Sequence, residues 1–264
     1  MHNVLVLCYH AVSNGWPSSL AVRATELENQ VRTLLDRGYT AATFGDALSG
    51  AASGVFVVTF DDGFQSVLDH GLPVLDRLGV PATMFVPTGL VGPAGLALWP
   101  GPDAWSDTEH REELRVLDWA GVRTLADHGW EIGSHTCSHP RLTQLGDAEL
   151  AAELSDSRLE CERQLGRTCA SIAYPYGDYD ERVVAAAGEA GYRFGCTLPD
   201  KFTPSATLAW PRIGIYRDDG SMTFRLKTSQ ATMWIRQSPA WNTVSRLRRL
   251  IPRTAATEPP VGTD

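Results

Sequence analysis

VVTFDDG at residues 57–63 ends an apolar, β-branched run in two adjacent carboxylates and a glycine. Such a run is typical of a buried strand, and Gly63 is typical of the turn that ends it. Asp61 and Asp62 stand side by side at the end of that strand, where two negative charges repel each other unless a positive charge lies beside them. A divalent metal ion is the natural candidate for that charge. The segment therefore predicts a central strand with a metal site at its carboxyl end.

Strand and helix patterns alternate on both sides of this segment along nearly the whole chain. Strands are expected at residues 4–8, 40–44, 54–60, 81–86, 130–134, 171–174, 194–197 and 210–216, interspersed with helices at 25–37, 66–78, 117–128, 147–165 and 180–190. The alternation predicts a parallel α/β architecture, and the length of 264 residues suits a (β/α) barrel better than an open sheet. Barrels place their sites at the carboxyl ends of strands, where His10, Asp61, His135 and residues 174–176 are expected to lie.

The domain organisation is expected to be simple, because no internal repeat or boundary interrupts residues 1–238. Residues 239–264 are predicted to form a C-terminal helix and a polar, proline-rich disordered tail. The basic and partly apolar part of that helix, residues 241–251, is expected to be solvated. The alternative is weak contact with an anionic membrane surface.

Composition and charge argue against several classes of protein. A net charge of −8 without a concentrated basic face argues against nucleic acid as a partner. Five scattered cysteines, none of them in a CxxC pair, predict reduced thiols rather than a disulfide framework. The N-terminus has no basic region and too short an apolar run for a signal peptide, and no stretch is long and apolar enough to span a bilayer. We therefore expect a cytoplasmic protein.

The pattern breaks at residues 88–115, where glycine, proline and tryptophan dominate. A long loop of this kind in a compact domain is usually functional or disordered. Trp99 and Trp105 favour an ordered lid, because disordered loops seldom carry tryptophan. Their rings could stack on a sugar or simply pack against the protein.

Two further segments carry candidate functional residues. His135 and His139 are four apart, so one helical turn would put both imidazoles on one side. Two histidines and one carboxylate leave coordination positions open, which is typical of catalytic zinc sites. The run AYPYG at residues 173–177 is a strand end that enters a turn. Each segment alone has an ordinary interpretation as a turn or as surface histidines, but together, each at a strand end, they indicate a site.

These segments resemble the polysaccharide deacetylase family, or NodB-homology domain, from about residue 4 to residue 216. The most specific parts are TFDDG at residues 59–63 and GSHTCSHP at residues 133–140, and residues 119–142 also resemble the family's approach to its histidine motif. The resemblance implies a distorted (β/α) barrel that forms a single catalytic domain.

The resemblance also assigns roles to residues. It implies that Asp62, His135 and His139 bind the metal and that Asp61 is the catalytic base. Zinc is the expected ion, and cobalt, nickel and manganese are alternatives, because such sites accept several first-row metals. The oxyanion donor is the backbone N–H of Tyr176 by the same resemblance. The candidate substrate-binding residues are Tyr176, Pro175, Trp119 and Arg212.

Two features depart from the family pattern. Ala173 stands where the third motif usually has an arginine that orients the base. Arg212 is a candidate replacement, and the alternative is a surface arginine. The family usually takes its general acid from a C-terminal histidine, but no histidine follows His139. Tyr9-His10 resembles the rearranged poly-N-acetylglucosamine deacetylase subgroup, so we expect His10 to be the acid, with a structural role as the alternative.

The sequence therefore predicts a metal-dependent hydrolase that removes N-acetyl groups from an N-acetylated sugar, oligosaccharide or polysaccharide precursor. A zinc-class ion lowers the pKa of bound water to about 7, and Asp61 can take the proton as that water attacks. One alternative is hydrolysis of a small non-sugar amide by the same residues. Another is a carbohydrate-binding protein whose catalysis has decayed.

Overall fold

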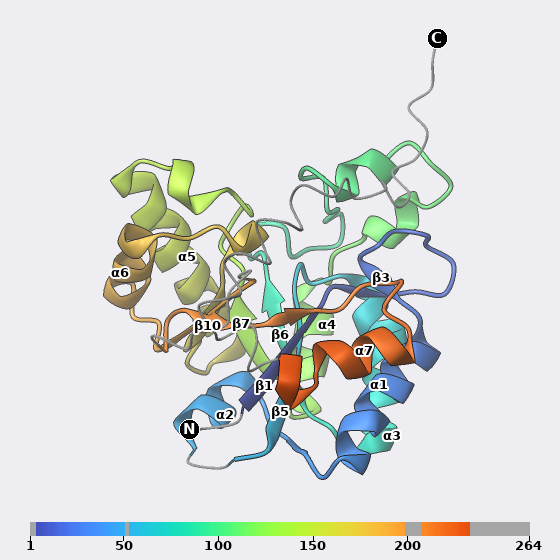
Figure 1. Cartoon of the computed structure of the whole chain (residues 1–264). Coiled ribbons are helices and arrows are strands. Elements are labelled where there is room, and N and C mark those ends of the chain that lie inside the picture. The colour runs from blue at the N-terminus through green and yellow to red at the C-terminus, as the bar shows by residue number, and fades with distance from the viewer. Residues whose placement is uncertain (1–3, 51–52, 199–206, 233–264) are drawn as a thin grey trace, which may run out of the picture.

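The longest strands, β1 (Val4–Tyr9) and β5 (Val55–Phe60), form from the predicted apolar runs and are buried along their whole length. The computed structural model describes residues 4–50, 53–198 and 207–232 (Figure 1). The other strands are β2 (Ala11–Val12), β3 (Ala21–Val22), β4 (Thr40–Ala41), β6 (Ala82–Val86), β7 (Glu131–Ser134), β8 (Ser171–Ala173), β9 (Phe194–Thr197), β10 (Trp210–Pro211) and β11 (Ile213–Gly214). The α-helices are α1 (Ala24–Asp36), α2 (Phe44–Ser49), α3 (Leu72–Leu78), α4 (Trp119–Asp127), α5 (Asp147–Leu165), α6 (Glu181–Glu189) and α7 (Ser221–Lys227).

The main sheet is a nearly closed barrel of parallel strands. Its order is β10-β9-β8-β7-β6-β5-β1-β11, with β4 paired to β5, and every pair is parallel. β10 and β11 lie at opposite ends of this order, yet only Arg212 separates them in the chain. The predicted distorted (β/α) barrel is confirmed. The single strand predicted at residues 210–216 is wrong, because the chain changes from one sheet edge to the other at Arg212.

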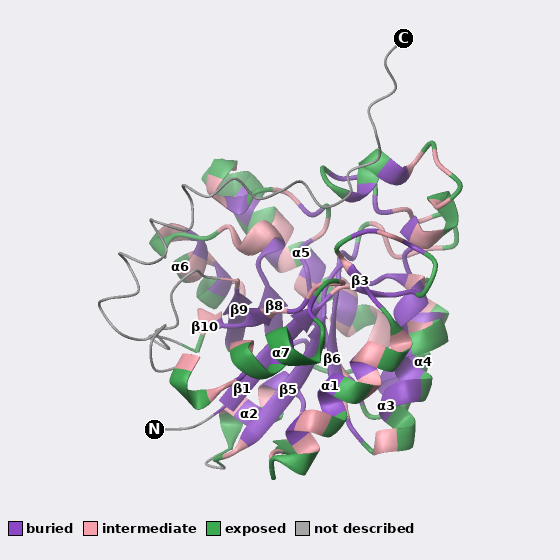
Figure 2. Ribbon diagram, turned by 45° about the vertical axis from the view of Figure 1, so that its right-hand side comes forward, coloured by how far each residue is buried: buried purple, intermediate pink, exposed green. Residues whose placement is uncertain are grey.

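A small apolar core fills the inside of the barrel. Alternate side chains of a strand face opposite sides, and Val6, Val57, Phe85 and Phe194 of β1, β5, β6 and β9 belong to this core. The Phe44 ring of α2 contacts both Phe85 and Phe194, whose strands are not neighbours in the sheet. The alternate residues form a larger core between the strands and the outer helices, and Figure 2 shows the strands buried beneath helices with exposed outer faces.

The helices cover the outside of the sheet in two groups (Figure 1). α1 contacts α3 and α7, whereas α5 contacts α6 on the other side of the central strands. The helix predicted at residues 66–78 is present, but its first turn is a π-helix at Val67–Gly71, directly before the Pro73 turn of α3. The helices therefore leave the carboxyl ends of the strands to the loops that carry the candidate site.

Residues 88–115 are ordered, as the two tryptophans predicted. They contain 3-10 helices at Pro102–Trp105 and Arg111–Leu114, and their far end is held where Gln65 N donates to Arg115 O at 2.8 Å. Trp99 and Trp105 are only 8% and 7% exposed, so both pack against the protein and neither offers a free face to a sugar. We call residues 88–115 the lid segment.

Some predictions concern parts of the chain that the structure leaves undescribed. The boundary after residue 238, the helix at 241–251 with its membrane alternative, and the tail all lie outside the described residues. Within the described ranges, none of the helices has both the length and the apolar character that a bilayer crossing requires.

Candidate metal centre and active site

Asp61 and Asp62 leave the end of β5 on a tight turn. Val57 faces the barrel interior, so the two-residue alternation brings Asp61 to the same side. Asp62 and Gly63 have left-handed backbone, with φ of 70° and 66°. The Asp61 and Asp62 side chains are almost fully buried, with 2% and 3% of each residue exposed. Two adjacent buried carboxylates need positive partners, because an unpaired buried charge is strongly unfavourable.

Asp62 faces two buried imidazoles. Its Oδ1 lies 3.4 Å from His135 Nε2 and 3.3 Å from His139 Nε2. His135 Nδ1 is 2.8 Å from the Ala173 carbonyl oxygen, which orients the ring and leaves Nε2 toward Asp62. Metal-ligating histidines usually have such a carbonyl partner on the other nitrogen. One carboxylate oxygen and two imidazole nitrogens, all close together, form a donor set that fits a zinc-class ion.

Residues 135–139, which carry the two histidines and are called the histidine loop below, are not helical. Thr136 and His139 both have positive φ, 67° and 62°, so the prediction of one helical turn between the imidazoles is wrong. The rings converge because the loop folds back on itself, and His139 N donates to Thr136 Oγ1 at 3.1 Å. The four-residue spacing predicted that the two imidazoles lie close together, and their ring centroids are 4.8 Å apart, although the backbone path is different.

Arg212 lies beneath the site and pairs with Asp61. Its Nη1 donates to Asp61 Oδ1 at 2.7 Å and its Nη2 donates to Asp61 Oδ2 at 2.6 Å. Nη1 also donates to Thr59 Oγ1 at 2.9 Å. The residue is 1% exposed, which rules out the surface interpretation. The bidentate contact fixes the orientation of the Asp61 carboxylate.

The two carboxylates remain ionised despite burial. Burial alone would raise the pKa of Asp61, but the Arg212 guanidinium and then His135 outweigh it and lower the pKa to about 2. Burial also acts to raise the pKa of Asp62, and hydrogen bonds with His135 and His139 reverse the shift, so its pKa lies well below the usual range. Both side chains therefore carry negative charge at neutral pH.

The two imidazoles respond differently to these charges. Burial would lower the pKa of His135, but Asp61 and Asp62 prevail and raise it. At His139 burial prevails, and the pKa is lowered although Asp62 lies close. Metal binding requires neutral imidazoles, so an ion at this position would compete with protonation of the two histidines.

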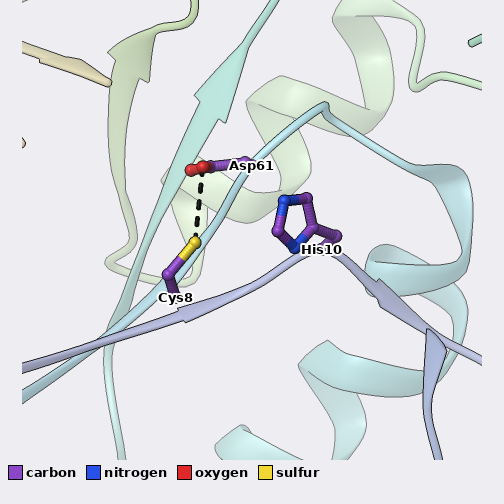
Figure 3. Close-up of side chains that lie close together, drawn as sticks. All are labelled: Cys8, His10 and Asp61. Atoms are coloured by element: carbon purple, nitrogen blue, oxygen red, sulfur yellow. Dashed lines mark hydrogen bonds between the residues drawn. The ribbon is translucent and has the colours of Figure 1, made fainter. Parts of the chain in front are cut away.

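Cys8 and His10 form a second group around Asp61. Ligand atoms of the three side chains lie within 4.8 Å of one another, and the Cys8 thiol donates to Asp61 Oδ2 at 3.4 Å (Figure 3). Burial raises the pKa of Cys8, so the group stays a thiol. His10 joins β1 to β2, and its buried Nδ1 has no hydrogen-bond partner among the described residues. Both Asp61 oxygens already accept from Arg212, so they are less available to a metal ion than the Asp62 carboxylate, which has no arginine partner among the described residues.

Aromatic rings surround His139. Trp99 of the lid segment stacks on it, with ring centroids 4.4 Å apart and planes 27° apart. Tyr176 meets it edge-on at 4.7 Å, and the Arg141 guanidinium lies 4.3 Å from the Tyr176 ring centroid. Tyr176 has φ of 58°, so the turn after β8 also adopts left-handed backbone. The rim of the site is therefore built by the lid segment, the histidine loop and the turn at Pro175–Gly177.

Two of the predicted substrate-binding residues, Pro175 and Trp119, remain to be located. Pro175 is buried in that turn, and Trp119 is the first residue of α4, where it packs against the larger core. Sequence reasoning missed the contact of Cys8 with Asp61 and that of Trp99 with His139. A signal existed for Cys8, because it follows Val6 at the two-residue period and so faces the barrel interior. The Trp99 contact had no local signal.

The amino-acid sequence is similar to a known protein family and to several known proteins. The family described as Polysaccharide deacetylase matches residues 50–195, more than half of the 264 residues. The chain is 28% identical over 198 residues to YxkH of Bacillus subtilis, covering 73% of this chain and 63% of YxkH. It is 24% identical over 213 residues to the poly-beta-1,6-N-acetyl-D-glucosamine N-deacetylase of Staphylococcus aureus, covering 75% of this chain and 69% of that protein.

A solved structure supports the fold. The Streptococcus pyogenes deacetylase PplD, determined with acetate, superposes with a TM-score of 0.71 at 24% sequence identity. The match covers 86% of this chain and 98% of PplD. The two molecules therefore share the same barrel.

Proposed function

Because the chain belongs to the polysaccharide deacetylase family, we propose that it is a metal-dependent hydrolase that removes N-acetyl groups from an N-acetylated sugar, oligosaccharide or polysaccharide precursor. One observation carries the proposal: a buried Asp62-His135-His139 group lies beside an aspartate that an arginine holds in place. Amide hydrolysis needs an activated water, a stabilised oxyanion and a protonated leaving amine, and each requirement has a candidate residue here.

Asp62, His135 and His139 would hold the ion. A divalent ion there would supply Lewis-acid chemistry, which polarises an acetyl carbonyl and makes a water molecule more acidic. The donor set suits zinc, and cobalt, nickel or manganese are alternatives.

Asp61 would accept the proton of the attacking water. It is ionised at neutral pH, and Arg212 holds both of its oxygens, so the carboxylate has one defined orientation. Arg212 thereby takes the place of the arginine that the family has at the position of Ala173. The backbone N–H of Tyr176 would stabilise the oxyanion.

His10 would donate the proton to the leaving amine. It lies beside Asp61, with a ring nitrogen within 4.8 Å of a carboxylate oxygen of Asp61. The N-terminal origin of this histidine agrees with a chain that has no histidine after His139.

The proposed substrate is an N-acetylglucosamine oligomer with β-1,6 linkages. The Staphylococcus aureus relative is named for removing acetyl groups from that polymer. Because Trp99 and Trp105 are packed, the Tyr176 ring with Arg141 beside it is the better candidate to contact the sugar. The chain spans 63% of the length of YxkH, and the substrate of the whole protein is part of this proposal.

Acetate release tests the function. Purified protein is stripped of metal, then supplied with Zn²⁺ or Co²⁺ and incubated with β-1,6-linked or β-1,4-linked N-acetylglucosamine oligomers, or with a small N-acetylated amine. Metal-dependent release is expected from the β-1,6-linked oligomers, and faster release from the β-1,4-linked ones would contradict the proposed linkage. Asp61→Asn is expected to reduce turnover by about 100-fold or more, the scale of general base catalysis.

Three other outcomes would redirect the proposal. Release from the small amine alone would indicate a non-sugar amidase. Bound metal without release from any substrate would contradict the deacetylase. Neither metal binding nor release would favour a carbohydrate-binding protein whose catalysis has decayed.

A further inference from the structure

The loop between the two histidine ligands has a backbone that it would not adopt alone. Thr136 and His139 both have left-handed φ, 67° and 62°, although neither is glycine. Such residues are unfavourable and persist only where the surrounding structure holds them. The support for this loop therefore matters for the site, and it comes from α5.

One carboxylate on α5 binds the middle of the loop. Glu153 Oε2 accepts from Cys137 N at 2.8 Å and from Ser138 N at 3.0 Å. Glu153 Oε1 accepts from Ser138 Oγ at 2.5 Å. All three donors belong to residues that lie between His135 and His139. An ionised acceptor makes hydrogen bonds about twice as strong as a neutral one, so this contact is strong.

A second contact from α5 supports the start of the loop. Ser157, one turn after Glu153, accepts from Ser134 Oγ at 2.8 Å and donates to Glu153 O at 2.7 Å. Ser134 Oγ in turn accepts from Thr136 N at 3.0 Å. The same face of the helix thus holds the end of β7 and the loop that follows.

We propose that Glu153 is a positioning residue for the metal centre, whose carboxylate holds residues 135–139 in the conformation that presents both imidazoles to Asp62. The inference rests on the metal centre of the proposed function. Glu153 does not belong to the donor set of Asp62, His135 and His139. It acts on the metal through the backbone of the loop.

Three variants of Glu153 and one matched control separate positioning from charge. Glu153→Ala removes all three hydrogen bonds. Glu153→Gln removes the charge, but its amide oxygen can still accept from both backbone N–H groups, and its amide N–H can donate to Ser138 Oγ. Glu153→Asp keeps the charge and shortens the reach. Asp156→Asn removes one charge from an exposed residue of the same helix that lines the same surface hollow as Glu153.

The measurement is the zinc affinity of the metal-stripped full chain, by competition with a chromogenic chelator. Circular dichroism of the metal-free proteins reports whether each variant folds. Glu153→Ala is expected to raise the Kd for Zn²⁺ by about 10- to 100-fold, the range for loss of a residue that orients metal ligands. Glu153→Asp should lose affinity in the same direction, Glu153→Gln should lose clearly less, and Asp156→Asn should bind zinc as the wild type does.

Several results would overturn the inference. Folded Glu153→Ala with a Kd within about twofold of the wild type would show that the loop needs no support from this carboxylate. If Glu153→Ala does not fold, zinc binding by Glu153→Asp at the wild-type affinity would have the same meaning. Equal losses of zinc affinity in Asp156→Asn and Glu153→Gln would show that the negative charge of the helix, and not the hydrogen bonds of Glu153, supports zinc binding. A wild type that binds no zinc would instead refute the metal centre itself, so the two failures are distinguishable.

Discussion

Asp61 and Arg212 are 151 residues apart in the chain, yet they form two hydrogen bonds of 2.7 and 2.6 Å. Asp61 has only 2% of its surface exposed and Arg212 only 1%, so each neutralises a charge that would otherwise lie unpaired in the protein. The same contact determines which way the Asp61 carboxylate faces. If Asp61 is the base of the proposed function, stability and catalysis both depend on this one pair.

Replacement of Arg212 by methionine should affect both the stability of the protein and the proposed catalysis. Breaking a buried pair on one side costs about 3–5 kcal/mol, because the remaining charge stays buried, so Arg212→Met is expected to lose roughly that free energy of unfolding in urea. In the wild type the low pKa of Asp61 contributes stability above its ordinary pKa of 3.8, and this is lost as pH falls toward about 2. Without Arg212 burial is no longer offset by the guanidinium, so the pKa of Asp61 should rise.

The control for this variant is Arg115→Met. The Arg115 side chain is 55% exposed and lies 3.8 Å from Glu112, so its loss should change stability by about 0.5 kcal/mol or less. Similar destabilisation by both substitutions would contradict a special role for the Arg212 pair.

His10 allows a test of the proton donor. His10→Ala is expected to reduce deacetylation by about 100-fold or more, because an acid positioned at the leaving amine contributes on this scale. Zinc content should be unchanged, because His10 is outside the group of Asp62, His135 and His139. Turnover and bound zinc are measured on the same preparation, beside His70→Ala at an exposed position. Lost zinc or undiminished turnover would contradict the role as acid.

At the scale of elements, Glu131 joins four parts of the barrel. It is the first residue of β7 and accepts from Gly45 N of α2 at 2.8 Å and from Thr83 Oγ1 of β6 at 3.1 Å. Ser171 of β8 donates to its other oxygen. Burial nevertheless outweighs these hydrogen bonds and raises the pKa of Glu131. The ionised form is therefore less favourable in the folded protein than in the unfolded chain.

This shift predicts how Glu131→Gln should depend on pH. A raised pKa means that the folded wild type binds the proton more tightly, so its stability falls as pH rises above the ordinary pKa of 4.5. Glutamine can keep the hydrogen bonds without the charge, so the variant should gain stability relative to the wild type from pH 4.5 upward. Urea unfolding across that range measures the difference. Glu112→Gln, whose side chain is 81% exposed, should show no such trend, and an equal trend would contradict the prediction.

The lid segment and the histidine loop show the limits of reading elements one at a time. The tryptophans correctly predicted order in the lid segment, but not that Trp99 would stack on His139 at 4.4 Å. The spacing of His135 and His139 correctly predicted convergence, but through a helical turn that the structure replaces with left-handed backbone. In both cases the conformation depends on contacts with another element, here His139 and α5.

At the scale of the whole molecule, the fold buries four of the five cysteines. Cys8, Cys161, Cys169 and Cys196 are buried and Cys137 is partly exposed, and all five are free thiols, as the scattered spacing predicted. Cys137 lies in the histidine loop, where burial raises its pKa. Reactivity toward thiol reagents therefore reports on the integrity of the barrel, because the reactive species is an accessible thiolate.

Thiol titration tests this arrangement. A chromogenic disulfide reagent at mildly alkaline pH is expected to modify at most one thiol of the native protein, and all five after unfolding in guanidinium chloride. Cys137→Ser should abolish the native reaction. Rapid modification of several native thiols would show that the barrel is more open than described, and fewer than five after unfolding without reductant would reveal a disulfide.

Local pattern was sufficient for the long strands of the main sheet and their order along the chain, whereas β2 and β3 were not predicted and residues 210–216 form two short strands rather than one. Asp61, Asp62 and His135 were identifiable because apolar runs end in them, and the alternation of elements was enough for a parallel barrel with its site at the carboxyl ends of strands. These features depend on residues that are near one another in the sequence, so they can be predicted from the sequence alone.

Only the tertiary structure decided which distant groups complete the site. Arg212 had two open interpretations in the sequence, because nothing near it distinguishes a surface arginine from a buried one. The structure buries it because the chain crosses from β10 to β11 at that residue, which brings the guanidinium to Asp61. Trp99 and Glu153 reach the histidine loop in the same way, through packing of segments far apart in the chain. Such contacts arise when the barrel closes, and no local pattern of residues specifies them.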